Sequence, residues 1–286
     1  MSDQTQAIMK VIISYGTYKM KNVILASIIC TASLSAHAHD IWIKADTHEI
    51  NNEEQKIFAL DVSRSAQAYV AESNHQIKNL LMTTPQGEIK KITADFSGKV
   101  KEVFEVEFNS SGTYHFESPE TQVFLSFYHD EDGKKHKIRM PKTQYHKLPK
   151  GSKPEKTVEK LLVTETYVSY NGFSTIMQPS TQGLQIILKQ HPNKLRVGEE
   201  LRFKVTYNGK PVPDAEVTLK GLNNFYYQDD ESVKVELEDK NNGLVIFEPK
   251  IPGRYLLGVE YGVELQNNKN ADFRSIERFL TFEITE

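Results

Sequence analysis

The chain is almost free of cysteine, and none of its apolar runs is long. Its single cysteine among 286 residues is Cys30, inside a segment that we predict to be removed during export. The mature protein is therefore expected to have no disulfide, no thiolate metal ligand and no cysteine nucleophile. Any metal site would use histidine, carboxylate or backbone donors, or the new amino terminus.

The segment 1–38 is interpreted as an extension followed by a cleavable signal peptide. Lys21 gives a positive start, residues 23–34 form an apolar run, and Ala36 and Ala38 are the small residues that signal peptidase requires. The run is too short to span a bilayer, and Ile29 before Cys30 argues against a lipid anchor. We expect cleavage after Ala38 and a soluble periplasmic product without a transmembrane segment.

The charge balance gives no reason to expect a nucleic-acid partner. Removal of residues 1–38 takes away three lysines and one aspartate, which leaves 32 basic and 37 acidic residues. A basic surface for polyanions needs a clear excess of Lys and Arg. The basic run 134–139 directly follows the acidic residues 130–132, so a solvated hairpin is the preferred interpretation.

Alternation of apolar and charged residues predicts an all-β fold. Residues 104–108, 201–207 and 233–237 alternate with period two, which is typical of strands that bury one face. Turn residues close these segments, as Asn208-Gly209 does in a predicted hairpin. Residues 154–162 are the best candidate for a single helical turn.

Two antiparallel β-sandwich domains, immunoglobulin-like in architecture, fit this pattern best. Residues 178–183 are rich in polar and turn residues and precede a clear strand at 184–188. We therefore predict a first domain at 39–180 and a second, immunoglobulin-like domain at 181–286.

Four passages carry a family resemblance: the opening His39-Asp40-Ile41-Trp42-Ile43, the strand 160–170, the module 191–218 and the turn 252–255. Together they resemble a family of exported bacterial proteins of unknown function, often described as the periplasmic component of nickel or cobalt uptake systems. The resemblance implies a metal ion or metal chelate as ligand, a membrane uptake system as partner, and an immunoglobulin-like second domain.

His39, at the predicted mature terminus, is the leading metal-ligand candidate. Its α-amine and imidazole can chelate one ion, and neutral imidazole suits Ni, Co, Cu or Zn. His115 and His129, on successive predicted strands, are the candidate partner ligands. The alternative is that His39 only begins a strand and that the other histidines are hydrogen-bonded or solvated.

No known catalytic signature is present in the sequence, so the leading interpretation is a non-enzymatic periplasmic binding or accessory protein. The acidic loop 130–133 lacks the spacing of a calcium loop and predicts a hairpin turn. The aromatic run 225–227 either binds a ligand or caps a sheet edge. Two alternatives remain: a copper-dependent oxygenase with a histidine brace at His39, and a purely structural envelope module without metal.

Overall fold

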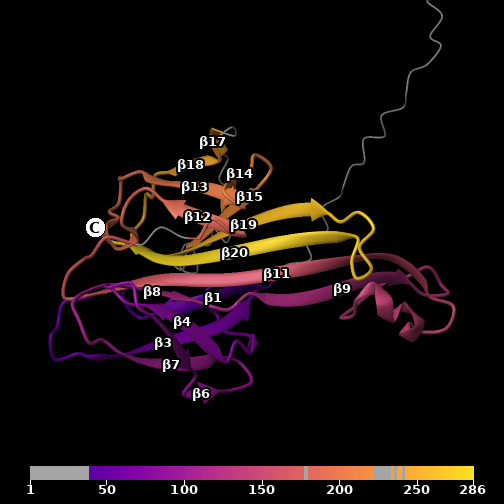
Figure 1. Ribbon diagram of the computed structural model, residues 1–286, viewed down its shortest axis with the longest axis horizontal. Helices are drawn as coiled ribbons and strands as arrows, with labels where there is room; N and C mark the ends of the chain where they lie inside the picture. The colour runs from indigo at the N-terminus through magenta and orange to yellow at the C-terminus, as the bar shows by residue number, and fades with distance from the viewer. Residues whose placement is uncertain (1–38, 177–179, 222–232, 235–236, 240–241) are drawn as a thin grey trace, which may run out of the picture. The chain divides into compact units, whose positions relative to one another are not determined.

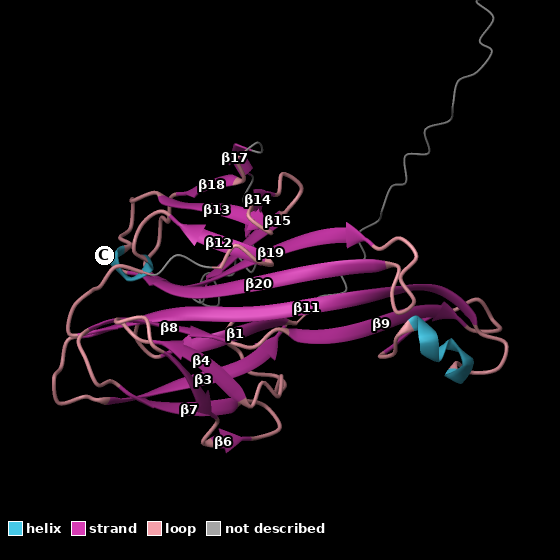
Figure 2. Cartoon of the chain, in the orientation of Figure 1, coloured by secondary structure: helices cyan, strands magenta, loops and turns pink. Residues whose placement is uncertain are grey.

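In the part of the chain that the structure describes, the alternating segments form β-strands that are arranged in three sheets (Figures 1 and 2). The computed structural model describes residues 39–176, 180–221, 233–234, 237–239 and 242–286. The predicted signal peptide with Cys30, part of the predicted boundary segment and the aromatic run 225–227 lie outside the described residues. Among the described residues, no helix is long and apolar enough to cross a membrane.

Two of the sheets are purely antiparallel. The first, sheet A, has the order β1-β3-β7-β6, with the strands β1 (Asp40–Ala45), β3 (Ile57–Ser65), β7 (Glu102–Glu107) and β6 (Phe96–Ser97). The second, sheet C, has the order β12-β13-β18-β17 with β14 beside β13, and contains β12 (Leu184–Leu188), β13 (Leu201–Tyr207), β18 (Leu244–Phe247), β17 (Leu237–Asp239) and β14 (Lys210–Pro211).

The third sheet, sheet B, has 11 strands and draws on both halves of the sequence. Its main path is β16 (Val233–Lys234), β15 (Glu216–Gly221), β19 (Gly253–Glu264), β20 (Phe273–Ile284), β11 (Lys153–Tyr170), β8 (Gly112–Glu117), β4 (Asn79–Thr83) and β5 (Ile89–Thr93). The strands β2 (Glu49–Ile50), β9 (Thr121–His129) and β10 (Lys135–Ile138) complete it. Two short 3₁₀ helices, η1 (Lys142–Lys147) and η2 (Pro192–Lys194), lie in the connections.

Sheet B contributes to two hydrophobic cores, one on each face. Successive side chains of a strand point to opposite faces, and neighbouring residues of β11 accordingly enter different cores. Leu162 and Val168 join the core built with sheet A, whereas Tyr167 joins the core built with sheet C. β20 divides in the same way, with Phe279 in the first core and Leu280 in the second. The all-β class with two sandwich cores is thus confirmed.

The two halves of the sequence meet where β11 and β20 run side by side (Figure 1). Their nine residue pairs, from Val158 opposite Phe273 to Thr166 opposite Thr281, are parallel, as are the pairs of β2 with β11, and both are exceptions to the antiparallel pairing predicted for the sandwiches. The described residues belong to one compact unit. The division at residue 180 into 39–180 and 181–286 remains a prediction.

The predicted helical turn at 154–162 is also wrong, because these residues belong to the 18-residue strand β11. They pair with β9 on one side, and from Val158 onward with β20 on the other. Thr157, Glu159 and Leu162 are buried there. Pairing on both edges satisfies the backbone donors and acceptors of this segment. The strand 184–188 and the Asn208-Gly209 turn were predicted correctly.

We predict that the fragment 182–286 is much less stable than the chain 39–286 and self-associates. Without β11, nine residues of β20 present an unpaired edge, and Arg278 loses its partner on β11. Size-exclusion chromatography and thermal unfolding of the two proteins at equal concentration would measure this. A monomeric fragment with the melting temperature of the longer chain would contradict it.

Candidate functional site

A cluster of charged side chains lies where β8, β11 and β20 come together. His115 and Glu117 stand two residues apart on β8, so both point to the same face of sheet B. β8 pairs with β11 in antiparallel register, with His115 opposite Tyr167, and continuation of that register places Glu117 opposite Glu165. Arg278 comes from the neighbouring strand β20, opposite Val163. Strand pairing therefore gathers residues that are far apart in sequence.

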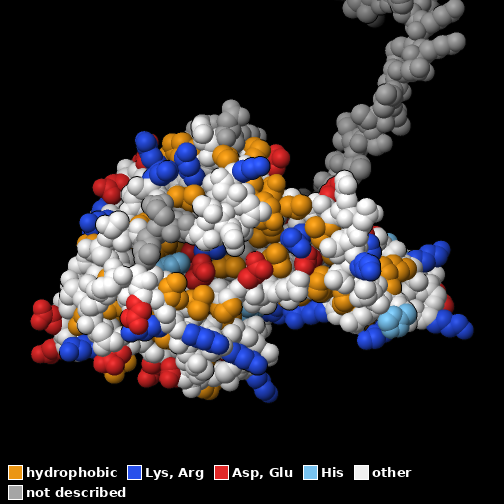
Figure 3. Space-filling view, viewed as in Figure 1, with side chains coloured by type: hydrophobic (Ala, Val, Ile, Leu, Met, Phe, Trp, Pro, Cys, Tyr) orange, Lys and Arg blue, Asp and Glu red, His pale blue; other side chains and the backbone are white. Residues whose placement is uncertain are grey.

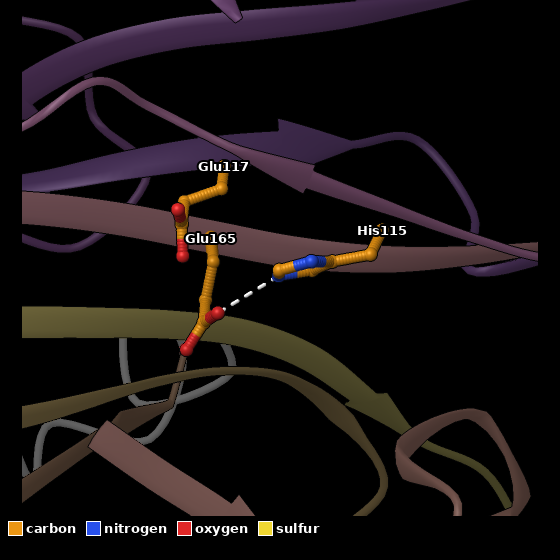
Figure 4. Close-up of side chains that lie close together, drawn as sticks. All are labelled: His115, Glu117 and Glu165. Carbon is orange, nitrogen blue, oxygen red and sulfur yellow. Dashed lines mark hydrogen bonds and ion pairs between the residues drawn. The ribbon is translucent and has the colours of Figure 1, made fainter. Parts of the chain in front are cut away.

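His115 is held by a hydrogen bond and by ring stacking. Its Nε2 lies 2.8 Å from Oε2 of Glu165, the contact drawn in Figure 4. Its ring stacks on Tyr167, with centroids 4.4 Å apart and an interplanar angle of 18°. Figure 4 shows the Glu117 and Glu165 side chains close to this imidazole. The two contacts fix the direction in which Nε2 points.

Arg278 binds both carboxylates of the cluster. Its Nε donates to Oε1 of Glu165 at 2.9 Å and its Nη2 donates to Oε2 at 2.7 Å, a two-pronged arrangement that suits a guanidinium and a carboxylate. Nη2 also contacts the Glu117 carboxylate. Glu165 and Arg278 are buried. Arg278 is therefore the resident cation of the cluster.

The protonation state of Glu165 follows from these partners. Burial alone would raise the pKa of this carboxyl group, but the Arg278 charge and the His115 hydrogen bond outweigh burial and lower the pKa to about 2. With a neutral imidazole at His115, two carboxylates and one guanidinium give the cluster a net charge of −1, which favours a further cation.

The histidine and the two glutamates satisfy the geometric requirement for a metal site. One ligand atom from each of His115, Glu117 and Glu165 lies within 4.8 Å of the other two. An imidazole nitrogen with two carboxylate oxygens suits a divalent transition metal. Arg278 already donates to both carboxylates, so an ion would compete with the guanidinium for the same oxygens.

Two hollows adjoin the cluster. A cavity of about 20 Å³, lined by His115, Tyr167 and Thr113 among others, has room for one water molecule. A larger pocket of about 250 Å³ is lined by Glu117 and Arg278 and by the segment that leads into β12. On the face drawn in Figure 3, a histidine and several acidic side chains lie in a row across the middle of the described chain.

The structure separates the histidines that the sequence analysis had grouped as metal ligands. His115 lies opposite Tyr167 on β11, whereas His129 lies opposite Lys153, 14 residues away along the same strand. At about 3.3 Å per residue the two are more than ~40 Å apart, so they cannot share an ion. His39 is partly exposed, and its Nε2 lies 2.9 Å from a Glu72 carboxylate oxygen. That His39 or His129 binds a metal ion without the other histidines remains a prediction.

Several other histidines have structural hydrogen bonds. Nδ1 of His48 lies 2.9 Å from the Tyr167 carbonyl oxygen, and Nε2 of His191 lies 2.7 Å from the Thr113 hydroxyl. Burial lowers the pKa of His48, and it lowers the pKa of His191 to about 4. His136 pairs with Asp130 at 2.6 Å across the β9–β10 hairpin, which confirms the hairpin interpretation of the acidic loop.

Comparison with protein families identifies the chain at the level of its family. Residues 36–262 match the family described as a domain of unknown function, DUF4198, and the chain belongs to this family. The match includes residues of all three sheets and ends within β19. A search of curated proteins found no match.

Comparison with solved structures returns modular β-proteins at low similarity. The D0-D1 domain of intimin is 11% identical, with 84% of this chain and 96% of that chain covered and a TM-score of 0.20. The chicken CNTN1 FN1-FN3 domains are 8% identical, with coverages of 87% and 100% and a TM-score of 0.21. The fibronectin(III)-like modules of Clostridium thermocellum CbhA are 9% identical, with coverages of 83% and 93% and a TM-score of 0.18. These scores carry no argument about function.

We predict that Glu165→Gln destabilises the protein in a pH-dependent way. The carboxyl pKa is about 2 in the folded state against an ordinary 4.5, so its ionised form contributes about 3 kcal/mol above pH ~4.5. This stability is lost as the pH falls toward 2, and roughly half remains at pH 3. Urea unfolding of wild type and variant at pH 7 and pH 3 would measure the difference.

Glu88→Gln is the matched control, because Glu88 is exposed and its pair with Lys90 contributes little to stability. The control should leave the free energy of unfolding almost unchanged at both pH values. A Glu165→Gln variant as stable as wild type at pH 7 would refute the role given to the buried pair.

Proposed function

We propose that this chain is an exported, non-enzymatic periplasmic binding or accessory protein whose ligand is a divalent transition metal, nickel or cobalt, or a chelate of it, on the way to a membrane uptake system. The observation that carries the proposal is the convergence of His115, Glu117 and Glu165, with ligand atoms within 4.8 Å of one another. The signal peptide interpreted at 1–38 and the resemblance of the opening His39–Ile43 support export and the choice of metal.

The chemistry of the cluster suits a protein that releases its metal again. One imidazole and two carboxylates form an incomplete ligand set, which water or a chelator would complete. Arg278 competes for the carboxylates, so the affinity is lower than that of the same three ligands without it. A delivery protein needs such exchange, whereas a permanent structural site closes its coordination sphere with protein ligands.

The structural-module alternative has one observation in its favour. Because Arg278 already neutralises part of the negative charge, the cluster is stable as an ion-pair network without metal. The copper-oxygenase alternative has less support, because a histidine brace needs a second imidazole and the side-chain contact of His39 is the Glu72 carboxylate.

The test is calorimetric titration of protein that begins at His39 with Ni²⁺, Co²⁺, Cu²⁺ and Zn²⁺. We expect binding of at least nickel or cobalt near pH 7.5, where imidazole is mostly neutral. His115→Ala should weaken it about tenfold or more, because it removes the nitrogen ligand. Unchanged affinity in His115→Ala would exclude this cluster as the site.

Arg278→Gln provides a second test with the opposite sign. It removes the competing cation, so we expect metal to bind severalfold to about tenfold more tightly. Arg274→Gln is the matched control, because Arg274 forms an ion pair from the same strand with Glu159 outside the cluster. The control should leave the affinity unchanged, and thermal unfolding would verify that both variants are folded. Weaker binding in Arg278→Gln than in this control would refute the competition.

A separate variant tests the amino-terminal site. One residue added before His39 converts its α-amine into a peptide nitrogen, which is a poor ligand near neutral pH. If the cluster is the site, this extension leaves the affinity unchanged while His115→Ala reduces it. The reverse result would move the metal to His39.

A further inference from the structure

One part of sheet B, where β9 lies between β10 and the first residues of β11, carries rows of basic side chains. No residue of 127–157 belongs to either hydrophobic core. Figure 1 shows β9 beside β11, and β10 pairs with the other edge of β9. Directly opposite residues of neighbouring strands point to the same face, as do residues two apart in one strand. The register therefore places six side chains on one face, which we call the lysine face: Lys135, His129 and Lys153 in one row, and Lys137, Phe127 and Lys156 in the next.

A β-bulge brings Lys156 onto the same face as Lys153, although the two are three residues apart. The register between β9 and β11 shifts just before Lys156, so Glu155 is the extra residue. Ring contacts agree with this placement, because Nζ of Lys135 lies 5.3 Å and Nζ of Lys156 lies 5.9 Å from the centre of the Phe127 ring. Two ammonium groups are thus held over one aromatic ring on the same side of the sheet.

The opposite face of these strands is covered by the segment that leads from β10 to β11. Oγ of Ser126 donates to the Met140 carbonyl oxygen at 2.7 Å, and the hydroxyl groups of Tyr145 in η1 and Thr157 share a hydrogen bond of 2.7 Å. Ser126 and Thr157 are buried, whereas all four lysines of the lysine face are exposed. The lysine face is therefore open to solvent.

Most of the charge on the lysine face is not compensated. Lys135 pairs with Glu155 at 2.9 Å, and this hydrogen bond lowers the pKa of the Glu155 carboxyl group, which is therefore ionised at neutral pH. The other three lysines form no ion pair with a described residue. Asp130, in the adjoining turn, binds His136 on the opposite face at 2.6 Å. Four lysines against one glutamate make the lysine face positive.

The type of basic residue indicates the kind of partner. All four cations of the lysine face are lysines. Protein interfaces are enriched in arginine, which binds carboxylates with two hydrogen bonds, and are depleted in lysine. Ammonium groups on flexible side chains suit an anionic surface whose charges are spread and mobile, such as a layer of phospholipid headgroups. Phe127, half-buried among the lysines, adds an apolar ring of the kind that lies at headgroup level.

We propose that the lysine face docks on a bilayer that contains acidic phospholipids. The ammonium groups lie against the headgroup phosphates, and the contact is reversible because it is electrostatic and screened by salt. The inference goes beyond the proposed metal function, because no residue of the lysine face belongs to the metal cluster.

The test is flotation of the protein 39–286 with two kinds of vesicle. One contains equal parts of phosphatidylglycerol and phosphatidylcholine, and the other contains phosphatidylcholine alone. We expect the protein to bind the first and not the second at about 0.1 M salt, and to be released at about 1 M salt, where charges are screened within about 3 Å.

Charge variants locate the contact on the protein. Lys137→Gln with Lys156→Gln should weaken binding about tenfold or more, since each lysine near an anionic surface contributes about fivefold. Lys91→Gln with Lys99→Gln is the matched control, because it changes the net charge equally at exposed lysines outside the lysine face, and it should have little effect. Glu155→Gln removes the anion of the face and should strengthen binding about fivefold.

The outcomes separate this inference from the metal function. His115→Ala should weaken metal binding and leave vesicle binding unchanged, so neither proposal decides the other. Equal binding to both vesicles, or unchanged binding in the folded double variant of Lys137 and Lys156, would overturn the proposal. Absence of binding to the acidic vesicles at about 0.1 M salt would also overturn it, and would leave an acidic protein as the partner of this face.

Discussion

The buried ion pair between Glu165 and Arg278 is the constraint on which the other features of the structure depend. It crosses the parallel contact of β11 and β20, where the two halves of the sequence meet. Burial of two charges is costly, and the cost is offset only when geometry and additional hydrogen bonds are good. Here Nε and Nη2 of Arg278 both donate to the Glu165 carboxylate, and Nη2 also contacts the Glu117 carboxylate on β8. His115 forms a further hydrogen bond with Glu165.

The same interaction connects the two cores with the candidate site. β11 and β20 each send alternate side chains into the core with sheet A and the core with sheet C, so a shift in their register would disturb both. A shift of two residues in the register of β11 against β20 would keep each side chain on its own face, so hydrophobic packing alone does not exclude it. The ion pairs Arg274–Glu159 and Arg278–Glu165 add polar contacts between the same two strands, the first between directly opposite residues and the second displaced by two. A metal that competes with Arg278 would therefore act directly on the junction between the halves.

The sequence predicted the parts of the fold that depend on local pattern. Alternation identified the strand at 201–207, and Asn208-Gly209 identified its hairpin, because both signals lie within a few residues. The parallel contact of β11 with β20 was missed because it joins segments more than 100 residues apart. The local sequence of neither strand indicates which strand it pairs with. The helical turn at 154–162 was wrong because tertiary pairing on both edges outweighed local propensity.

The candidate site was predicted only in part for the same reason. His115 was recognised because histidine is the usual nitrogen ligand, and the structure gives it two carboxylate neighbours. Glu117, Glu165 and Arg278 were not recognised, since in sequence each is one more charged residue of an alternating strand. The burial of Glu165 and Arg278 was the missing information, and it arises from layers that close over sheet B on both faces. The grouping of His115 with His129 failed because neighbouring strands can hold residues at opposite ends of a long third strand.

The central claim is that a divalent metal binds between His115, Glu117 and Glu165 in competition with Arg278. Anomalous diffraction from a crystal soaked in nickel or cobalt tests it most directly, because it locates the ion without reference to any variant. The account predicts an anomalous peak about 2.0–2.2 Å from Nε2 of His115, with the Arg278 guanidinium turned away from the Glu117 carboxylate. A peak at His39, or a fully loaded crystal with no peak at this cluster, would contradict it.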